Sequence, residues 1–271
     1  MADLLDLEAV QRGFSAMAAE YDALAESHPV VIWLRNRVRA LVEAQVAPPA
    51  SILEINAGSG LDAAYLAAQG YRVHATDVAP GMLAALAAKA AQPAAGGRLT
   101  YEELSNTELG VVAGGPYDLV FSNLGGLNCI EDLGRVTSGL TGLLRPGGRT
   151  VLVVMPRFCP WELALVFKGG VRKAFRRLSP RGTLAHVGGA ELRVWYHSPR
   201  SLERALGPEF ETLALRSFCS FCPPSYFDGF VRRHPGATRA LMRLDDRLGG
   251  NWPVRQLGDF YALVSRRREA S

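Results

Sequence analysis

Lysine is scarce in this chain of 271 residues: 30 side chains are Lys or Arg, and only Lys89, Lys168 and Lys173 are lysines. Arginine therefore carries almost all of the positive charge, and the formal net charge at pH 7 is only +4. A charge this modest does not indicate a protein dedicated to nucleic acid, whose binding face is usually strongly basic.

Cysteine is also scarce, with Cys129, Cys159, Cys219 and Cys222 as its only occurrences. Four cysteines are too few for a disulfide framework. Cys219 and Cys222 form a C-x-x-C pair, but no second pair or histidine cluster nearby would complete a zinc site. We therefore expect buried thiols and no bound metal.

Long apolar runs are missing as well. The longest apolar strand candidate, TVLVVM at 150–155, is far shorter than the roughly 20 residues of a membrane-spanning helix. The beginning, MADLLDLEAV, is acidic and lacks the basic segment and apolar core of a signal peptide. With 48% hydrophobic and 21% charged residues, the composition is typical of a globular protein, and we expect a cytoplasmic location and no transmembrane segment.

Strand and helix patterns alternate after residue 50. We expect strands at 51–56, 71–77, 98–104, 117–123, 149–155, 210–218 and 259–267, and helices at 60–69, 80–92, 130–144 (ended by RPGG) and after an N-cap at Ser198. Apolar strands separated by helices predict a parallel sheet covered on both faces. The expected fold class is α/β, a doubly wound, seven-stranded, mostly parallel sheet with one antiparallel edge strand.

Three segments lie outside this alternation in what we expect to be a single domain spanning 1–271. Residues 8–45 have a helical pattern, so 1–46 is expected to form an N-terminal helical cap. Residues 157–196 and 219–256 are expected to be insertions that together form a lid and line the substrate pocket. The buried stripe expected in the cap is Val30, Val31, Leu34, Val38 and Leu41.

The segment ILEINAGSGLDA at 52–63 ends an apolar strand in a glycine-rich turn that leads into a helix. Gly58, Gly60 and Ala63 satisfy the G-x-G-x-x-G/A pattern of dinucleotide-binding folds. Glu54 argues against a nicotinamide dinucleotide, because a carboxylate inside a buried strand is costly without a cationic partner. A ligand with a positive centre would supply that partner.

The same residues resemble the first motif of the class I S-adenosylmethionine-dependent methyltransferases of small-molecule type. The family's acid and x-G-x-G turn are EINAGSG here, with Asn56 in place of the commonest first glycine. Four other segments resemble the family in the correct order: FSAMAAEYD (14–22), DVAPGML (77–83), YDLVFSNLGGLN (117–128) and LLRPGGRTVLVVM (143–155). The resemblance covers roughly 14–156, and 197–218 and 258–266 in topology only.

The resemblance implies S-adenosylmethionine as the cofactor and S-adenosylhomocysteine as its product. It implies that the glycines let the chain bend under the methionine part, that Asp77 binds the ribose, and that Tyr21 closes over the cofactor. Many relatives carry an acid and a small residue after the third strand, where this chain has Glu103, Leu104 and Ser105, so the adenine contact differs. The implied cofactor-binding residues are Tyr21, Glu54, Asn56, Ala57, Gly58, Gly60, Asp77, Val78, Met82, Leu104, Ser105 and Asn123.

Methyl transfer is an in-line displacement that needs alignment of donor and acceptor, and a base only where the acceptor must lose a proton. We predict transfer to a small, largely apolar or conjugated acceptor, such as a specialised metabolite, at oxygen, nitrogen or carbon. The alternatives are an NAD-type oxidoreductase and a cofactor-binding protein without methyl transfer activity. His197 is the candidate base because the first insertion rejoins the core there, with packing or capping as its alternative role.

The first insertion leaves the kind of partner open. A solvated basic face, a site for an anionic substrate, a lid over a hydrophobic substrate and an interfacial helix at a membrane surface are all compatible with its mixture of cationic and apolar side chains. No specific nucleic acid is expected, because NLGG after the fourth strand lacks the Pro-Pro-aromatic clamp of exocyclic-amine methyltransferases. The oligomeric state is left open. The residues of this mixture are Lys168, Arg172, Lys173, Arg176, Arg177 and Arg181 with Trp161, Leu165, Val166 and Phe167.

Overall fold

One seven-stranded sheet forms the centre of the protein, whose computed structural model describes the backbone of residues 2–269 and the side chains of residues 7–269. Its strand order is β3-β2-β1-β4-β5-β9-β8. Strands β1 to β5 pair in parallel, and β9 runs antiparallel to both β5 and β8. The expected fold class is confirmed, with the reversed strand one place in from the edge. The strands are β1 (Ser51–Glu54), β2 (Arg72–Asp77), β3 (Leu99–Glu103), β4 (Tyr117–Ser122), β5 (Leu144–Val154), β8 (Phe210–Phe218) and β9 (Phe260–Arg267).

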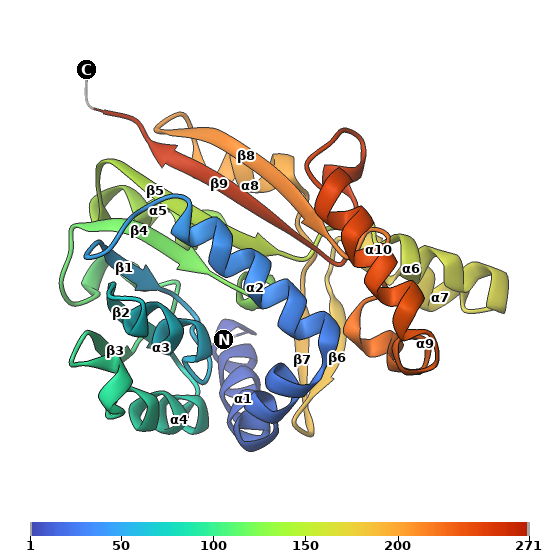
Figure 1. Ribbon diagram of the computed structural model, residues 1–271, viewed down its shortest axis with the longest axis horizontal. Coiled ribbons are helices and arrows are strands. Elements are labelled where there is room, and N and C mark those ends of the chain that lie inside the picture. The colour runs from blue at the N-terminus through green and yellow to red at the C-terminus, as the bar shows by residue number, and fades with distance from the viewer. Residues whose placement is uncertain (1, 270–271) are drawn as a thin grey trace.

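Helices cover both faces of the sheet (Figure 1). Successive strand residues point to opposite faces, so Ile52 of β1 packs in the core beneath α2, α3 and α4, whereas Leu53 packs beneath α5 and α8. Both side chains are fully buried. Within residues 2–269, no helix is both long and apolar enough to span a membrane. The helices are α2 (Pro29–Glu43), α3 (Leu61–Ala68), α4 (Pro80–Ala90), α5 (Gly134–Leu143) and α8 (Pro199–Leu206).

The expected N-terminal helical region consists of two helices, α1 (Ala2–Ser27) and α2, separated at His28. His28 has extended backbone angles, φ −84° and ψ 118°, because the ring of the following Pro29 disfavours the helical conformation at the preceding residue. The expected apolar stripe is only partly correct. Val30, Leu34, Val38 and also Val42 are buried, whereas Val31 and Leu41 are half-buried.

The segment RPGG at 145–148 follows the end of α5, as expected, but it belongs to β5, which was expected to begin only at residue 149. The helix ends at Leu143 and β5 begins at the next residue. RPGG lies inside β5, at a shift in its register with β4, between the pairs Tyr117–Leu144 and Leu119–Arg149. Gly147 has φ +76°, which glycine adopts without steric cost, so the strand accommodates the irregularity.

The first insertion contains two short helices, α6 (Pro160–Leu163) and α7 (Val171–Ala174), followed by a hairpin of β6 (Thr183–Val187) and β7 (Ala190–Val194). The second contains α9 (Asp228–Arg233) and α10 (Pro235–Leu248). The hairpin was not predicted. Short 3₁₀ helices connect the elements: η1 (Pro93–Ala95), η2 (Leu109–Val111), η3 (Gly126–Cys129), η4 (Ala164–Lys168), η5 (Arg176–Leu178), η6 (Ser225–Phe227) and η7 (Val254–Gln256).

Helix α1 packs between α4 on one side and the β6–β7 hairpin on the other. Glycines allow both contacts, because a Cβ on Gly81 would lie 2.6 Å from the carbonyl oxygen of Ser15, and one on Gly188 would lie 2.1 Å from that of Gly13. The backbone N–H of Gly81 also donates to the Ser15 hydroxyl at 3.1 Å. The first insertion thus holds α1 in place through its hairpin.

The C-x-x-C pair lies in a buried turn, as expected for structural thiols. Cys219 has φ +55°, and both thiols are free. Asp245 of α10 accepts hydrogen bonds from the backbone N–H groups of Ser220, Phe221 and Cys222 at 2.9, 3.2 and 2.7 Å. The carboxylate therefore stabilises the turn by satisfying three backbone donors.

A buried ionic network joins the two insertions to the start of β9. Arg177 Nη2 donates to Glu162 at 2.8 Å and to Asp259 at 2.5 Å, and Arg176 binds Glu162 through two hydrogen bonds of 2.6 and 2.8 Å. The Tyr226 hydroxyl donates to the same carboxylate at 2.6 Å. Burial acts to raise the pKa of Glu162, but the arginine hydrogen bonds outweigh it and lower the pKa to about 2.

Glu162→Gln should destabilise the protein, because it leaves the buried Arg177 with only one of its two carboxylates. Breaking a buried ion pair from one side costs about 3–5 kcal/mol, which thermal or urea unfolding at pH 7 would detect. The pKa of Glu162 is lowered on folding, so its contribution is complete above about pH 4.5 and is lost as the pH falls toward 2. The difference between wild type and variant should shrink over that window.

The matched control is Glu211→Gln, which breaks an exposed pair with Arg266 and should leave the unfolding midpoint nearly unchanged. Equal effects of the two substitutions would contradict a role for the buried network in stability.

Candidate functional site

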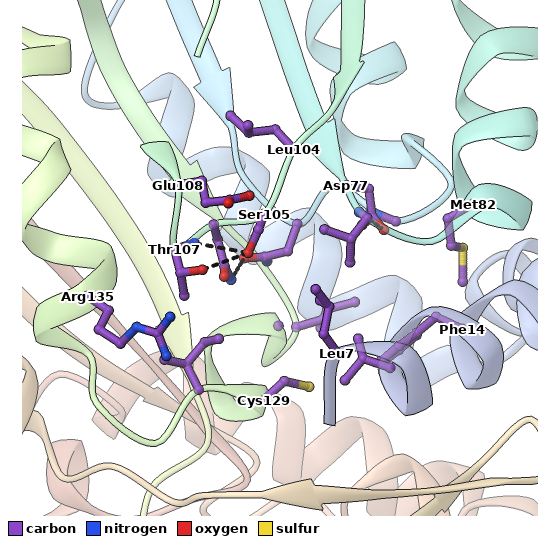
Figure 2. A pocket seen from close by; sticks show the side chains of 18 of the residues that line it. Leu7, Phe14, Asp77, Met82, Leu104, Ser105, Thr107, Glu108, Cys129 and Arg135 are labelled. Carbon is purple, nitrogen blue, oxygen red and sulfur yellow. Dashed lines mark hydrogen bonds between the residues drawn. The ribbon is translucent and has the colours of Figure 1, made fainter. Parts of the chain in front are cut away.

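A cavity of about 530 Å³ opens at the carboxyl ends of β1, β2 and β4, beneath α1 (Figure 2). This is where open α/β sheets usually bind ligands, and its volume is within the range of small-molecule sites, roughly 300–1,000 Å³. Four parts of the chain form most of its wall: α1, the glycine turn with the end of β2, residues 104–108 after β3, and residues 123–135 after β4.

The glycine turn adopts left-handed backbone conformations at three positions, with φ of +46° at Asn56, +58° at Gly58 and +79° at Gly60. Asparagine is among the few residues that tolerate this region, which explains how Asn56 replaces a glycine. Its amide donates to the Ser122 hydroxyl at 2.9 Å and its oxygen accepts from Asn106 at 3.2 Å. Asn56 therefore connects the turn to the ends of β3 and β4.

Asp77, the last residue of β2, faces the cavity beside the turn. Its carboxylate accepts the backbone N–H groups of Gly58 at 2.8 Å, Val78 at 2.8 Å and Ala79 at 2.9 Å. Burial nevertheless raises its pKa above the ordinary value. Oδ2 accepts only one of these bonds, so it retains capacity for a ligand hydroxyl.

Helix α1 is fixed over the glycine turn by consecutive residues. A Cβ at Gly58 would lie 3.9 Å from both the Tyr21 ring and Met82 Sδ, so both side chains flank this glycine. Asp22 accepts a hydrogen bond from the Ser59 hydroxyl and pairs with Lys89 of α4 at 2.5 Å. Tyr21 and Asp22 thus hold α1 against the turn.

Asp62, in the first turn of α3, is the centre of a buried polar cluster. Arg35 Nη1 donates to it at 2.5 Å and Arg39 Nε at 2.7 Å, both from α2. The amide of Asn123, at the end of β4, donates to the same carboxylate at 2.8 Å. Arg35 also donates to the Tyr21 hydroxyl at 2.9 Å, so the cluster connects α1, α2, α3 and β4.

Glu54 is buried beneath the turn, and its Oε2 has no hydrogen-bond partner among the described residues. Burial, reinforced by the negative charge of Asp62, raises its pKa well above the ordinary value, although Arg35 and Arg39 act in the opposite direction. A cationic ligand group placed near the turn would stabilise the ionised form of this carboxyl.

Nine of the twelve predicted cofactor-binding residues line the cavity: Tyr21, Asn56, Gly58, Asp77, Val78, Met82, Leu104, Ser105 and Asn123. Glu54, Ala57 and Gly60 do not line the cavity. They belong to the end of β1 and to the glycine turn that borders it. The Ser105 hydroxyl is hydrogen-bonded to Thr107 at 2.8 Å, and the neighbouring Asn106, Thr107 and Glu108, which the sequence did not single out, also face the cavity.

His197 is not on the cavity wall, contrary to its expected role. Its ring is buried, with Nε2 at 2.9 Å from the carbonyl oxygen of Ile130, and burial lowers its pKa. The residue packs between the first insertion and the β4–α5 loop. We therefore assign it no part in proton transfer.

Sequence reasoning missed an apolar wall that α1 contributes to the cavity. Leu7, Val10 and Phe14 line it, and their i, i+3, i+7 spacing is the helical signal that could have identified this face. Cys129 and Trp195 extend the wall. Figure 2 shows Leu7 and Phe14 on the side of the cavity opposite Ser105 and Asp77.

The two insertions contribute less to the cavity than expected. Trp195 is the first insertion's residue on the wall, and no described residue from 219–256 reaches it. Cys219 and Ser225 instead line a second cavity of about 160 Å³. Tyr21 and Leu124 line both cavities and form a partition between them. The residues of the second insertion line only the smaller cavity.

Gly60→Ala should destabilise the protein more than Gly97→Ala. Both glycines have left-handed conformations, φ +79° and +70°, but a Cβ at Gly60 would lie 2.2 Å from Leu86 Cδ1 whereas nothing lies within 4 Å at Gly97. Each alanine costs about 1–2 kcal/mol for the backbone, and the clash at Gly60 adds roughly 1–3 kcal/mol. Urea unfolding measures both, and equal losses would show that Leu86 moves away freely.

Comparison with family models matches residues 53–150 to a methyltransferase domain. Three similar solved structures share the fold. An S-adenosylmethionine-dependent methyltransferase from Methanosarcina mazei has a TM-score of 0.59 at 17% identity, over 85% of this chain and 98% of that one. The second is 1,6-didemethyltoxoflavin N1-methyltransferase from Burkholderia thailandensis, solved with 1,6-didemethyltoxoflavin and S-adenosylhomocysteine, with a TM-score of 0.56 at 18% identity over 97% and 88%.

The third is geranyl diphosphate C-methyltransferase from Streptomyces coelicolor A3(2), solved with Mg²⁺, geranyl diphosphate and S-adenosylhomocysteine, with a TM-score of 0.54 at 14% identity over 86% and 78%. No curated protein matches the sequence. At these identities the structures establish the fold, and the domain match includes the glycine turn and Asp77. Residues 53–150 therefore form a methyltransferase domain, in a chain that has the fold of these S-adenosylmethionine-dependent methyltransferases.

Proposed function

We propose that this methyltransferase binds S-adenosylmethionine in the 530 Å³ cavity with the ribose on Asp77. The carboxylate is fixed by three backbone donors and keeps acceptor capacity on Oδ2. The methionine part then lies over Gly58 beneath Tyr21, and the adenine lies toward Leu104 and Ser105. Backbone groups and the Ser105 hydroxyl take the place of the acid found in many relatives.

Glu54 fits a ligand that carries a positive charge. Its Oε2 is buried without a partner, and its pKa is raised by burial. The ammonium group of the cofactor, placed at the glycine turn, would favour the ionised carboxylate. Glu54 would act through the turn from behind the cavity wall, since it does not line the cavity itself.

We propose further that the acceptor is a small, largely apolar or conjugated molecule held against the α1 wall. The observation that carries this proposal is the row of Leu7, Val10 and Phe14, continued by Cys129 and Trp195, in the same cavity as the cofactor residues. A flat apolar molecule packed on such a wall loses water contact and gains aromatic contact from Phe14 and Trp195. A specialised metabolite of the cytoplasm is the class we favour.

The known ligands of two similar structures support this acceptor class by analogy. The Burkholderia thailandensis protein was solved with a small heterocycle, and the Streptomyces coelicolor protein with an isoprenoid diphosphate. Both ligands are small molecules that offer an apolar or conjugated surface. The analogy supports a small-molecule acceptor and leaves its identity to experiment.

The chain's own contribution to the reaction is alignment and exclusion of water. Tyr21 and the partition residue Leu124 border the place where both ligands would meet. Leu124 has φ +50° and its N–H is bonded to its neighbour Asn123 Oδ1 at 2.8 Å. A non-glycine residue in this conformation is strained, and here the strain places a side chain at the junction of the two cavities. No base is required if the acceptor is already nucleophilic.

Asp77→Ala should weaken S-adenosylhomocysteine binding, because it removes the ribose acceptor and the partner of Gly58. Charge-assisted hydrogen bonds of this kind are worth roughly 1.5–3 kcal/mol, so the dissociation constant should rise about 10- to 100-fold. Isothermal titration calorimetry measures it. Asp118→Ala is the control: it also removes a carboxylate that accepts a backbone N–H, from Ser51, but at the opposite end of the sheet. Equal losses of affinity would refute the ribose assignment.

Phe14→Ala and Trp195→Ala should raise KM for an apolar acceptor while the dissociation constant of S-adenosylhomocysteine stays close to the wild-type value. Truncating one aromatic side chain removes contact worth about 1.5–3 kcal/mol when fully buried. A screen of methyl acceptors with labelled cofactor identifies a substrate for the assay. If acceptors with charged, hydrophilic character are preferred and these substitutions leave KM unchanged, the proposed acceptor class is wrong.

A further inference from the structure

The first insertion contains an exposed projection that the proposed reaction does not use. We name residues 164–175, which comprise η4, the Gly169–Gly170 turn and α7, the basic finger. Figure 1 shows α6 and α7 projecting from one end of the molecule's longest axis, beyond the sheet and its helices.

The tip of the basic finger exposes large apolar side chains. Phe167 is 92% exposed, and Val166, Val171 and Phe175 are also exposed. Single exposed hydrophobic residues are ordinary, but a cluster of them usually marks an interaction site. The cluster is held by backbone structure, because Gly169 N–H donates to the Val166 carbonyl at 3.0 Å and Gly169 has φ +75°.

The charge of the basic finger has one sign. No acidic residue occurs between Glu162 and Glu191. Lys168, Arg172 and Lys173 are exposed, and none of them has a partner among the described residues. Two of the chain's three lysines are therefore placed here, while the third, Lys89, is used internally in the pair with Asp22.

We propose that the basic finger docks the protein on the surface of an anionic lipid bilayer. Exposed Phe167 and Val171 would enter the interface between headgroups and acyl chains, and the lysines and Arg172 would lie at the level of the negative headgroups. This combination of apolar residues and cations is the one that interfacial segments use, with long cationic side chains reaching back to the headgroups. The inference goes beyond the proposed function and does not depend on it.

Two other partners fit the basic finger less well. A nucleic acid would use the cations but has no need for exposed Val166 and Val171, since phosphate contacts and base stacking involve charged and aromatic side chains. A second copy of the chain, joined finger to finger by a twofold axis, would bring identical unpaired cations together. An anionic bilayer satisfies both the charge and the apolar side chains.

Vesicle co-sedimentation of the full chain tests the proposal, with vesicles of phosphatidylcholine alone and of phosphatidylcholine with phosphatidylglycerol. We expect binding to the anionic vesicles at physiological ionic strength and little binding to the neutral ones. Each cation near an anionic surface strengthens binding about fivefold, so Lys168→Glu with Lys173→Glu should weaken it by about 30-fold or more. Phe167→Ser with Val171→Ser should weaken it by at least about tenfold.

Matched controls separate the basic finger from general surface effects. Trp252→Ser changes another highly exposed apolar residue, and Arg200→Glu with Arg204→Glu makes the same charge change on α8. Both should bind vesicles like the wild type. All variants should keep the wild-type circular dichroism spectrum and thermal unfolding midpoint, which shows that they are folded. In a direct measurement, Phe167→Trp should add a fluorescence component that shifts to the blue with anionic vesicles.

Three results would overturn the proposal. The first is absence of wild-type binding to anionic vesicles, or binding that the finger variants leave unchanged. The second is a dimer in light scattering that Phe167→Ser dissociates, which would assign the surface to a second copy. The third is salt-resistant binding to duplex RNA or DNA that depends on Lys168 and Lys173. Because vesicle binding needs no acceptor, a failed methyl-transfer assay would leave this result unaffected.

Discussion

The buried carboxylate of Asp62 is the interaction on which the site depends. It receives Arg35 and Arg39 from α2 and Asn123 from the end of β4, while its own helix begins at the glycine turn. A carboxylate buried this deeply needs such donors, because burying an unpaired charge is costly. Because α2 and β4 meet at one group, the glycine turn, α2 and the end of β4 keep a fixed geometry before any ligand binds. Such preorganisation lowers the cost of aligning two reactants.

The residues that the sequence singled out for the cofactor gather around one cavity because each is set by a local feature of the chain. The glycine turn, Asp77 and Met82 follow directly from strand ends, and strand ends are visible as changes of apolar pattern. Asn56 in particular shows why a substitution in a motif need not change the structure, since asparagine reaches the same left-handed conformation, φ +46°. The order of strands along the chain then determines where these residues meet.

The substrate half could not be predicted in the same way, because it depends on contacts between distant segments. His197 was chosen for its position in the chain, but its ring contacts the Ile130 carbonyl and does not line the cavity. Residues 219–256 pack on α2 and α6 and leave the main cavity to α1. The β6–β7 hairpin did have a local signal, the Gly188–Gly189 pair between two short alternating segments, which was not recognised.

The contact between Gly13 of α1 and Gly188 of the hairpin determines which changes the enzyme can accept. The two backbones approach so closely that a Cβ at Gly13 would lie 2.6 Å from the Val187 carbonyl oxygen, and one at Gly188 2.1 Å from the Gly13 carbonyl oxygen. Leu7, Val10 and Phe14, on the same helix, line the cavity, although Val10 and Phe14 also pack against a buried cluster. Directed evolution of acceptor range therefore has more freedom at these three positions than at the two glycines, so mutational libraries should keep the glycines constant.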